Sequence, residues 1–250
     1  MARAKKTMAT ARPVERATGE VTKQSNGRVA ATARANTPSP IQPPRTLDLE
    51  AALKHLRQTA PRMAALIRSR VRPELKRTRN PYRELTRAII YQQLSGKAAA
   101  TICARFVALY PGVTFPRPEM VMETSFERLR SVGLSKQKAS YVLDLASRYA
   151  RGEIQHRRFA RLSNEEISAE LVQVKGIGQW SADMFLLFGL NRPDVLPVGD
   201  LGVQKGMQIY FDLPALPKPA EMVTLAEPWR PYRSIASWYM WRVAEGGLEE

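Results

Sequence analysis

The sequence has little cysteine, little histidine and no long hydrophobic run. Its 250 residues include one cysteine, Cys103, and two histidines, His55 and His156. A single cysteine excludes an internal disulfide framework and an iron–sulfur cluster, and so few histidines argue against a zinc centre. No apolar stretch approaches the roughly 18 residues that a membrane-spanning helix needs, so no membrane partner is expected.

Acidic residues are also scarce relative to basic ones. The 23 Asp and Glu residues face 39 Lys and Arg residues, which gives a formal net charge of +16. This excess predicts a polyanionic partner such as nucleic acid, and a protein that is merely basic is the alternative. The 44% hydrophobic and 25% charged content is typical of a globular protein. The chain is long enough for one ordinary domain or two small ones.

Residues 1–46 have the composition of an unfolded tail. They contain almost no large apolar residues and nine basic residues against Glu15 and Glu20, so much of the positive charge lies there. The tail lacks the apolar core of a secretory signal. Its arginines are compatible with an organelle transit peptide, but the two acidic residues favour a loose DNA-binding arm or a plain linker.

From Leu47 onward, apolar residues recur at helical spacing. Pro61 and Pro81 are placed at helix starts, and Ser95 is placed to cap a helix that runs to Tyr110. Ser163 is expected to cap another helix. Further helices are expected over residues 125–130, 136–149 and 201–210, and loops over residues 111–118 and 211–219. Because no segment alternates convincingly with a period of two, we predict an all-α fold.

Residues 174–178, with the sequence VKGIG, form an expected hairpin between two helices. Gly176 and Gly178 allow a tight turn and the close approach of another backbone. The free N–H groups at the start of the second helix suit a phosphate oxygen, and Lys175 adds positive charge. This helix-hairpin-helix pattern favours contact with the DNA backbone without base readout. A tight turn between two core helices is the alternative.

Asp200 follows Pro197-Val198-Gly199, beyond the second helix of this motif. An aspartate here can simply cap the next helix. Capping and catalysis are compatible, because a helix N-terminus favours an ionised carboxylate. Such a carboxylate can stabilise an oxocarbenium-like sugar and position water on its anomeric carbon, as N-glycosidic hydrolysis requires. The base would first have to leave the duplex and stack in an apolar pocket.

Four segments carry a family resemblance, in this order: YQQLS (91–95), VKGIGQWSA (174–182), PVGDLG (197–202) and PWRPYRSIASWYMWR (228–242). Together they resemble the helix-hairpin-helix (HhH-GPD) superfamily of base-excision DNA glycosylases, most closely the 3-methyladenine DNA glycosylase II group of alkylation-repair enzymes. The resemblance covers residues 47–246. It implies a two-lobed all-α fold with the active cleft between the lobes. The flanks, about 47–80 and 205–246, would form one lobe, residues 81–204 the helical lobe with the hairpin, and residues 247–250 a short tail.

The resemblance also implies roles for individual residues. Asp200 falls on the catalytic aspartate of the family. Trp180 falls where lyase-competent relatives have a Schiff-base lysine, which implies a monofunctional enzyme with water as the nucleophile; a core packing role is the alternative. Trp241 and Gln92 match residues of the base pocket, and Trp180 is expected to line the same pocket. An indole face suits an alkylated, positively charged purine. Met184 stands where some relatives have a pocket tyrosine.

Residues of the DNA contact follow in the same way. The amides of Gly176 and Gly178, beside Lys175, would hold phosphate. Gln93 falls on the position of the intercalating residue, which is often leucine in the family, and Leu94 lies next to it. Which of these two enters the duplex is left open.

No cofactor is expected to be required. In the family, the carbonyls of the hairpin can hold a structural monovalent cation that bridges to DNA. In this chain these carbonyls would belong to Val172, Val174 and Ile177.

The sequence therefore predicts a monofunctional DNA N-glycosylase of base excision repair. It would flip alkylated purines such as 3-methyladenine out of double-stranded DNA and remove them by hydrolysis, acting as a monomer. A non-catalytic helix-hairpin-helix protein that binds damaged DNA is the alternative. We expect the cytoplasm, at the nucleoid, if the chain is bacterial, and the nucleus if it is eukaryotic.

Overall fold

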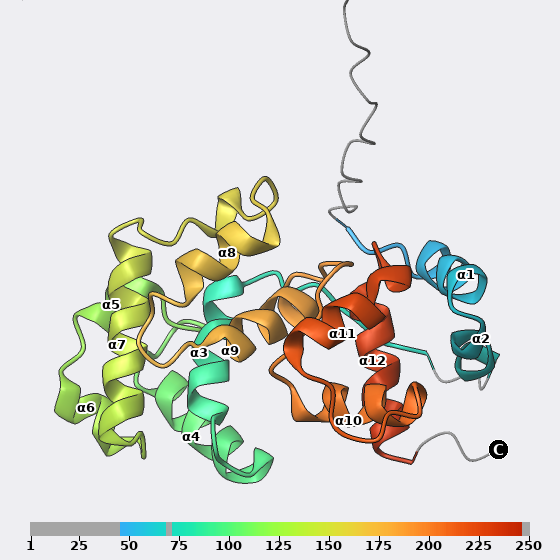
Figure 1. The fold of residues 1–250 in the computed structure, drawn as a ribbon. Coiled ribbons are helices and arrows are strands. Elements are labelled where there is room, and N and C mark those ends of the chain that lie inside the picture. Colours follow the sequence, from blue (N-terminus) through green and yellow to red (C-terminus); the bar gives the residue numbers. More distant parts are fainter. Residues whose placement is uncertain (1–45, 69–71, 247–250) are drawn as a thin grey trace, which may run out of the picture. The chain divides into compact units, whose positions relative to one another are not determined.

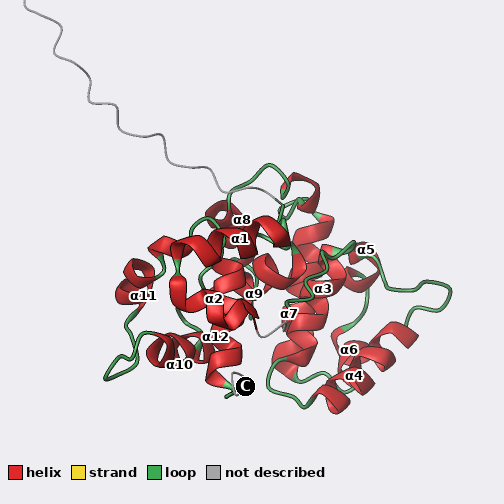
Figure 2. Cartoon of the chain, turned by 90° about the vertical axis from the view of Figure 1, so that its right-hand side faces the viewer, coloured by secondary structure: helices red, strands yellow, loops and turns green. Residues whose placement is uncertain are grey.

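Helices are the regular secondary structure of residues 46–68 and 72–246, the part of the chain described by a computed structural model (Figures 1 and 2). The all-α prediction is confirmed for these residues. They all belong to one compact unit, residues 40–250. The two predicted tails are residues 1–46 and 247–250. Apart from residue 46, they lie outside the described residues.

The described residues contain twelve α-helices. Their bounds are α1 Leu49–Thr59, α2 Pro61–Arg68, α3 Pro81–Tyr91, α4 Gly96–Ala108, α5 Pro118–Met122, α6 Phe126–Ser131, α7 Lys136–Ala150, α8 Asn164–Leu171, α9 Gln179–Met184, α10 Leu201–Tyr210, α11 Pro219–Leu225 and α12 Arg233–Ala244. Two 3₁₀ turns, His156–Arg158 and Glu227–Trp229, and one π-helical turn, Phe185–Gly189, complete the described helical structure.

The helix starts follow the capping chemistry of the sequence. Pro61 and Pro81 occupy first helical positions, where the fixed φ of proline suits the helix and its missing N–H costs nothing. The Ser95 hydroxyl accepts the Ala98 N–H at the start of α4. At α8, Ser163 and Glu166 form a reciprocal capping box. These predicted starts are confirmed.

Two predicted loops are shorter than expected. The loop predicted over residues 111–118 ends where Pro118 starts α5, and the loop predicted over 211–219 ends where Pro219 starts α11. Neither α5 nor α11 was predicted. In both places the last proline of a proline-rich loop serves as the first residue of a helix, for the same geometric reason as at Pro61.

The described residues bury two hydrophobic clusters. The buried members of the first cluster run from Tyr82 to Val195 and belong mainly to α3, α4 and α6 to α9. The second joins α1 and α2 to the C-terminal helices α10 to α12, with Trp229 and Tyr239 among its largest fully buried side chains. Within it, α10 and α12 lie side by side (Figure 1). A Cβ at Gly206 of α10 would lie 2.0 Å from the Met240 carbonyl oxygen, so the missing side chain permits this close packing.

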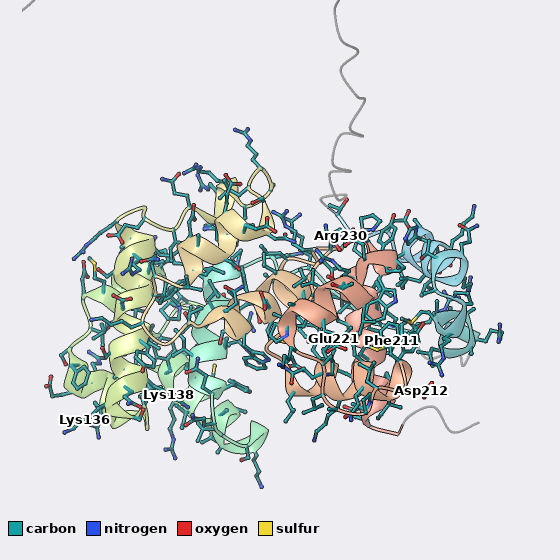
Figure 3. The ribbon with its side chains drawn as sticks, viewed as in Figure 1. Lys136, Lys138, Phe211, Asp212, Glu221 and Arg230 are labelled. Atoms are coloured by element: carbon teal, nitrogen blue, oxygen red, sulfur yellow. The ribbon has the colours of Figure 1, made fainter. Side chains whose placement is uncertain are left out.

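The segment between the π-helical turn and α10 is fixed by a buried carboxylate. The Asp194 side chain, 3% exposed, accepts bonds of 2.6 and 2.9 Å from the Arg233 guanidinium. Arg230, labelled in Figure 3, adds a contact of 3.3 Å. The Ser234 hydroxyl accepts the Val195 N–H at 2.9 Å. These bonds anchor the segment that leads into α10 to the start of α12.

The π-helical turn follows α9 without a break. The Leu190 N–H donates to the Phe185 carbonyl at 2.9 Å, a step of five residues instead of the α-helical four. Leu186 and Leu187 are buried, whereas Phe188 is 42% exposed. The wider turn therefore brings one aromatic ring out of the core next to the residues described below.

Candidate active site

Asp200 lies at the N-terminus of α10 and accepts three hydrogen bonds. Its Oδ1 accepts the Val203 N–H at 2.8 Å, which is the predicted helix cap. The same oxygen accepts the indole N–H of Trp241 at 2.7 Å, and Oδ2 accepts that of Trp180 at 2.7 Å. The residue is only 8% exposed. An ionised carboxylate is purely a hydrogen-bond acceptor, so three converging donors suit the anion.

The two indoles approach this carboxylate from different helices. Trp180 comes from α9 and is 50% exposed, and Trp241 comes from α12. The Trp241 ring stacks on Phe188, with centroids 5.6 Å apart and planes at 24°. The sequence predicted both tryptophans as base-pocket residues. The hydrogen bonds to Asp200 were not predicted, because they depend on how α9 and α12 present the indole edges.

A cavity of about 920 Å³ opens beside Trp180. It is lined by side chains of α3, α7, α9, the hairpin and the π-helical turn. Its volume falls within the range of ligand pockets, roughly 300–1,000 Å³. The predicted pocket residues Gln92, Trp180 and Met184 line it. Trp241 and Asp200 are not among the lining residues. Each contacts a residue that does line the cavity: Asp200 binds Trp180, and Trp241 stacks on Phe188.

Several lining residues were not predicted from the sequence. Arg87 lies over the Tyr91 ring at 5.2 Å, and both line the cavity. Lys138 lines it too, near the start of α7 (Figure 3). Its ammonium donates to the carbonyls of Ile90 and Gln92 at 2.7 and 2.6 Å, and burial lowers its pKa. Lys138 thus satisfies carbonyls that the end of α3 leaves free. Nothing in the local sequence indicates this long-range contact.

The structure requires glycine at only one of the two glycine positions of the hairpin. Gly176 has a φ of 81°, and a Cβ there would lie 2.1 Å from the Tyr141 ring. Gly178 caps α9 with a φ of −92°, and a Cβ there would meet no described atom within 4 Å. The turn therefore does not require glycine at residue 178, because other residues adopt this conformation. The backbone of Gly178 is left open to an approaching molecule. Gln92 holds the hairpin by donating to the Gly176 carbonyl at 2.8 Å.

The other predicted DNA-contact residues lie at the hairpin or at the end of α3. Lys175 is exposed, and its N–H donates to the Asp144 carboxylate at 2.9 Å. Gln93 is exposed, lines the cavity and has a φ of 54°. Leu94 is 40% exposed. Both residues are thus exposed directly after the end of α3.

The predicted cation-binding carbonyls belong to the end of α8 and the hairpin. Val172 is the C-cap of α8, and the Val174 carbonyl accepts the Ile177 N–H at 3.0 Å. Within residues 46–68 and 72–246 there is no group of three His, Cys, Asp or Glu side chains that could hold a metal ion. In the same ranges, no helix is both long and apolar enough to cross a membrane.

Comparisons with known proteins show the family of the chain. Residues 86–231 match the HhH-GPD family, described as "HhH-GPD superfamily base excision DNA repair protein". DNA-3-methyladenine glycosylase 1 of Schizosaccharomyces pombe is 38% identical over 168 residues, 67% of this chain and 74% of that protein. The structure of the S. pombe 3-methyladenine DNA glycosylase Mag1 with abasic DNA has a TM-score of 0.67 and 34% identity, covering 80% of this chain and 99% of that one. A DNA-3-methyladenine glycosidase structure from Bacillus halodurans has a TM-score of 0.73 and 31% identity, covering 80% and 91%. The chain therefore belongs to the HhH-GPD superfamily of base excision DNA repair proteins.

Proposed function

We propose that this protein is a DNA glycosylase that flips alkylated purines such as 3-methyladenine out of duplex DNA and removes them by hydrolysis. The observation that carries the proposal is the Asp200 carboxylate, which is 8% exposed and oriented by two indole N–H groups beside a cavity of about 920 Å³. The names of the relatives support the same substrate class, and the S. pombe structure contains abasic DNA, the product of base removal.

The arrangement suits the chemistry of N-glycosidic hydrolysis. As the bond between the base and the sugar C1′ breaks, its electron pair leaves with the base and positive charge develops on the sugar. The Asp200 carboxylate stabilises that charge, and a water adds its oxygen to C1′ and releases a proton. A cationic alkylated purine leaves without prior protonation. The aromatic face of Trp180 and the polarisable Met184 in the cavity suit such a flat, positively charged ring.

We propose further that the enzyme has no lyase activity. A lyase needs an amine nucleophile at the sugar, and Trp180, which cannot form a Schiff base, donates to Asp200 at 2.7 Å. Of the two lysines that line the cavity, Lys76 and Lys138, Lys138 donates to two backbone carbonyls, so its ammonium is engaged in the fold. Borohydride treatment of the enzyme with substrate DNA should yield no covalent adduct. A trapped adduct would contradict this part of the proposal.

The hairpin carbonyls of Val172, Val174 and Ile177 are proposed to hold a monovalent cation. Carbonyl oxygens at the end of a helix attract cations, and a bound cation would contribute positive charge toward a DNA phosphate. The melting temperature of the free protein should be higher in potassium chloride than in tetramethylammonium chloride at equal ionic strength. Equal melting temperatures would argue against the cation.

The enzymatic proposal is tested by Asp200→Asn. Asparagine can still cap α10, so the variant should fold, but it lacks the negative charge. The wild type should release alkylated bases from duplex DNA, and Asp200→Asn should do so at least about 100-fold more slowly. Asp48→Asn, an exposed cap on α1, is the matched control and should retain full activity. Absence of base release by the wild type, or equal rates for the wild type and Asp200→Asn, would refute the proposal.

A further inference from the structure

We infer that Gly202 is a positioning residue of this site: because it has no side chain, the Trp241 indole reaches Asp200 and orients the carboxylate. The inference rests on the proposed function, since it assigns Trp241 a role in the reaction through Asp200. It separates two tryptophans that the sequence treated alike. Trp180 both lines the cavity and binds Asp200, whereas Trp241 binds Asp200 without being among the lining residues.

The distances around Gly202 leave no room for a side chain. A Cβ there would lie 2.6 Å from Trp241 Cδ1, 3.0 Å from Trp241 Nε1 and 3.1 Å from Asp200 Oδ1. Carbon atoms in van der Waals contact are about 3.5–4.0 Å apart, so even a methyl group would displace the indole from its 2.7 Å hydrogen bond. Glycine is unfavourable inside a helix, and Gly202 lies in the first turn of α10 without a positive φ. The α10 backbone therefore gives no reason for glycine at this position.

The surrounding packing restricts where the indole could go instead. One turn further along α10, Gly206 brings the helix against the backbone of Met240, the residue before Trp241. This contact fixes the spacing of α10 and α12, and hence the position of the Trp241 side chain relative to α10. Its ring already stacks on Phe188 at 5.6 Å. A substitution at Gly202 therefore has to move the Trp241 ring relative to Asp200.

A displaced Trp241 ring would leave the Asp200 carboxylate less firmly oriented. Oδ1 is held by the Val203 N–H and the Trp241 N–H, and Oδ2 is held by Trp180 alone. Trp180 is half exposed and lines the cavity, so it is free to contact a substrate base. Trp241 then keeps the plane of the carboxylate fixed while Trp180 contacts the base in the cavity.

The first test observes the contact directly by nuclear magnetic resonance. The chain has four tryptophans, so four indole N–H resonances are expected, and single Trp→Phe variants assign them. Asp200→Asn should shift the resonances of Trp180 and Trp241, and Gly202→Ala should shift that of Trp241. The matched control is Gly199→Ala, in the turn just before α10, where a Cβ would meet no described atom within 4 Å. It should leave all four resonances in place.

The second test measures single-turnover base release and DNA binding separately. Gly202→Ala should slow release by about 10- to 100-fold, as expected for loss of one hydrogen bond to a charged group. Its Kd for abasic duplex DNA should stay within about twofold of the wild type, and Gly199→Ala should match the wild type in both. If Gly202→Ala does not fold, Trp241→Phe keeps an aromatic ring without the N–H and should show the same loss.

The outcomes distinguish this inference from the proposed function. An unmoved Trp241 resonance in Gly202→Ala, or base release as fast as in Gly199→Ala, would overturn the positioning role. A wild type that releases no base would refute the glycosylase activity, and with it the catalytic consequence, while the resonances would still decide whether Gly202 controls the indole contact.

Discussion

Asp183 provides a quantitative test of the structure through the pH dependence of stability. It lies on α9 with 8% of its surface exposed, and its Oδ1 accepts the Gln179 side-chain N–H at 2.8 Å. Gln179 also donates to the Ser168 hydroxyl at 3.2 Å. Burial raises the pKa of Asp183 from 3.8 to about 6, and the bond from Gln179 opposes this shift in part. The charged form is thus less favourable in the folded protein than in the unfolded chain.

The sign of the effect follows from this direction. At a pH where Asp183 is protonated in both the folded and the unfolded protein, its ionisation does not affect the free energy of unfolding. As pH rises above about 4, the unfolded chain releases its proton first, so folding becomes less favourable until the pH passes about 6. A pKa difference of this size corresponds to about 3 kcal/mol in a fully shielded site. Because replacing the carboxylate leaves another polar group to be buried, the net gain expected from such a substitution is smaller, about 1–2 kcal/mol.

Asp183→Asn removes the charge while keeping an oxygen that can accept from Gln179. The free energy of unfolding, measured by urea denaturation, should exceed that of the wild type by about 1–2 kcal/mol at about pH 8, with little gain at about pH 4. Asp48→Asn, an exposed cap, is the control and should show no comparable gain at the higher pH. If Asp183→Asn is no more stable than the wild type at the higher pH, the account of a desolvated carboxylate is wrong.

Two further predictions use matched pairs. Gly176→Ala should lower the free energy of unfolding by about 2–5 kcal/mol, because it combines a positive φ with a clash against Tyr141. Gly178→Ala should leave stability within about 0.5 kcal/mol and weaken DNA binding, and fluorescence anisotropy with a labelled duplex checks this. Asp194→Asn should cost about 3–5 kcal/mol in urea unfolding, since it leaves the charge of Arg233, whose side chain is only 12% exposed, unpaired. Asp212→Asn, at an exposed ion pair, should cost about 0–1 kcal/mol; equal losses at the two sites would contradict the role of burial.

Much of the fold could be predicted because it rests on local chemistry. A serine before an apolar run, as at Ser95 and Ser163, caps a helix through contacts with residues only three positions away. Proline at a first helical position, as at Pro81, acts through its own ring. Asp200 was likewise predicted as a cap and as the reactive carboxylate from its place after the hairpin and the loop. Such features need no knowledge of the tertiary structure.

The missed features depend on contacts between distant segments. The Trp241 N–H bond to Asp200 requires the crossing of α10 and α12, which Gly206 permits. Lys138 donates to carbonyls at the end of α3, which is distant in the sequence, and no sequence pattern links the two. Gly178 was assigned a conformational role from its residue type, although glycine also occurs where only an outside molecule needs the space. Sequence reasoning named some residues of the candidate site, and the structure supplied their hydrogen-bond partners and further lining residues.

The π-helical turn makes the site sensitive to chain length as well as to chemistry. It contains one residue more than an α-helical turn would, and the bond from Leu190 to Phe185 closes it. Deleting a single residue there would convert the turn to α-helix and rotate every following position by about 100°. Phe188 would turn away from Trp241, and the segment leading to Asp200 would start from a different angle. A one-residue deletion in residues 185–189 would therefore remove this geometry, so alignments of such chains should show gaps on either side of the turn but not within it.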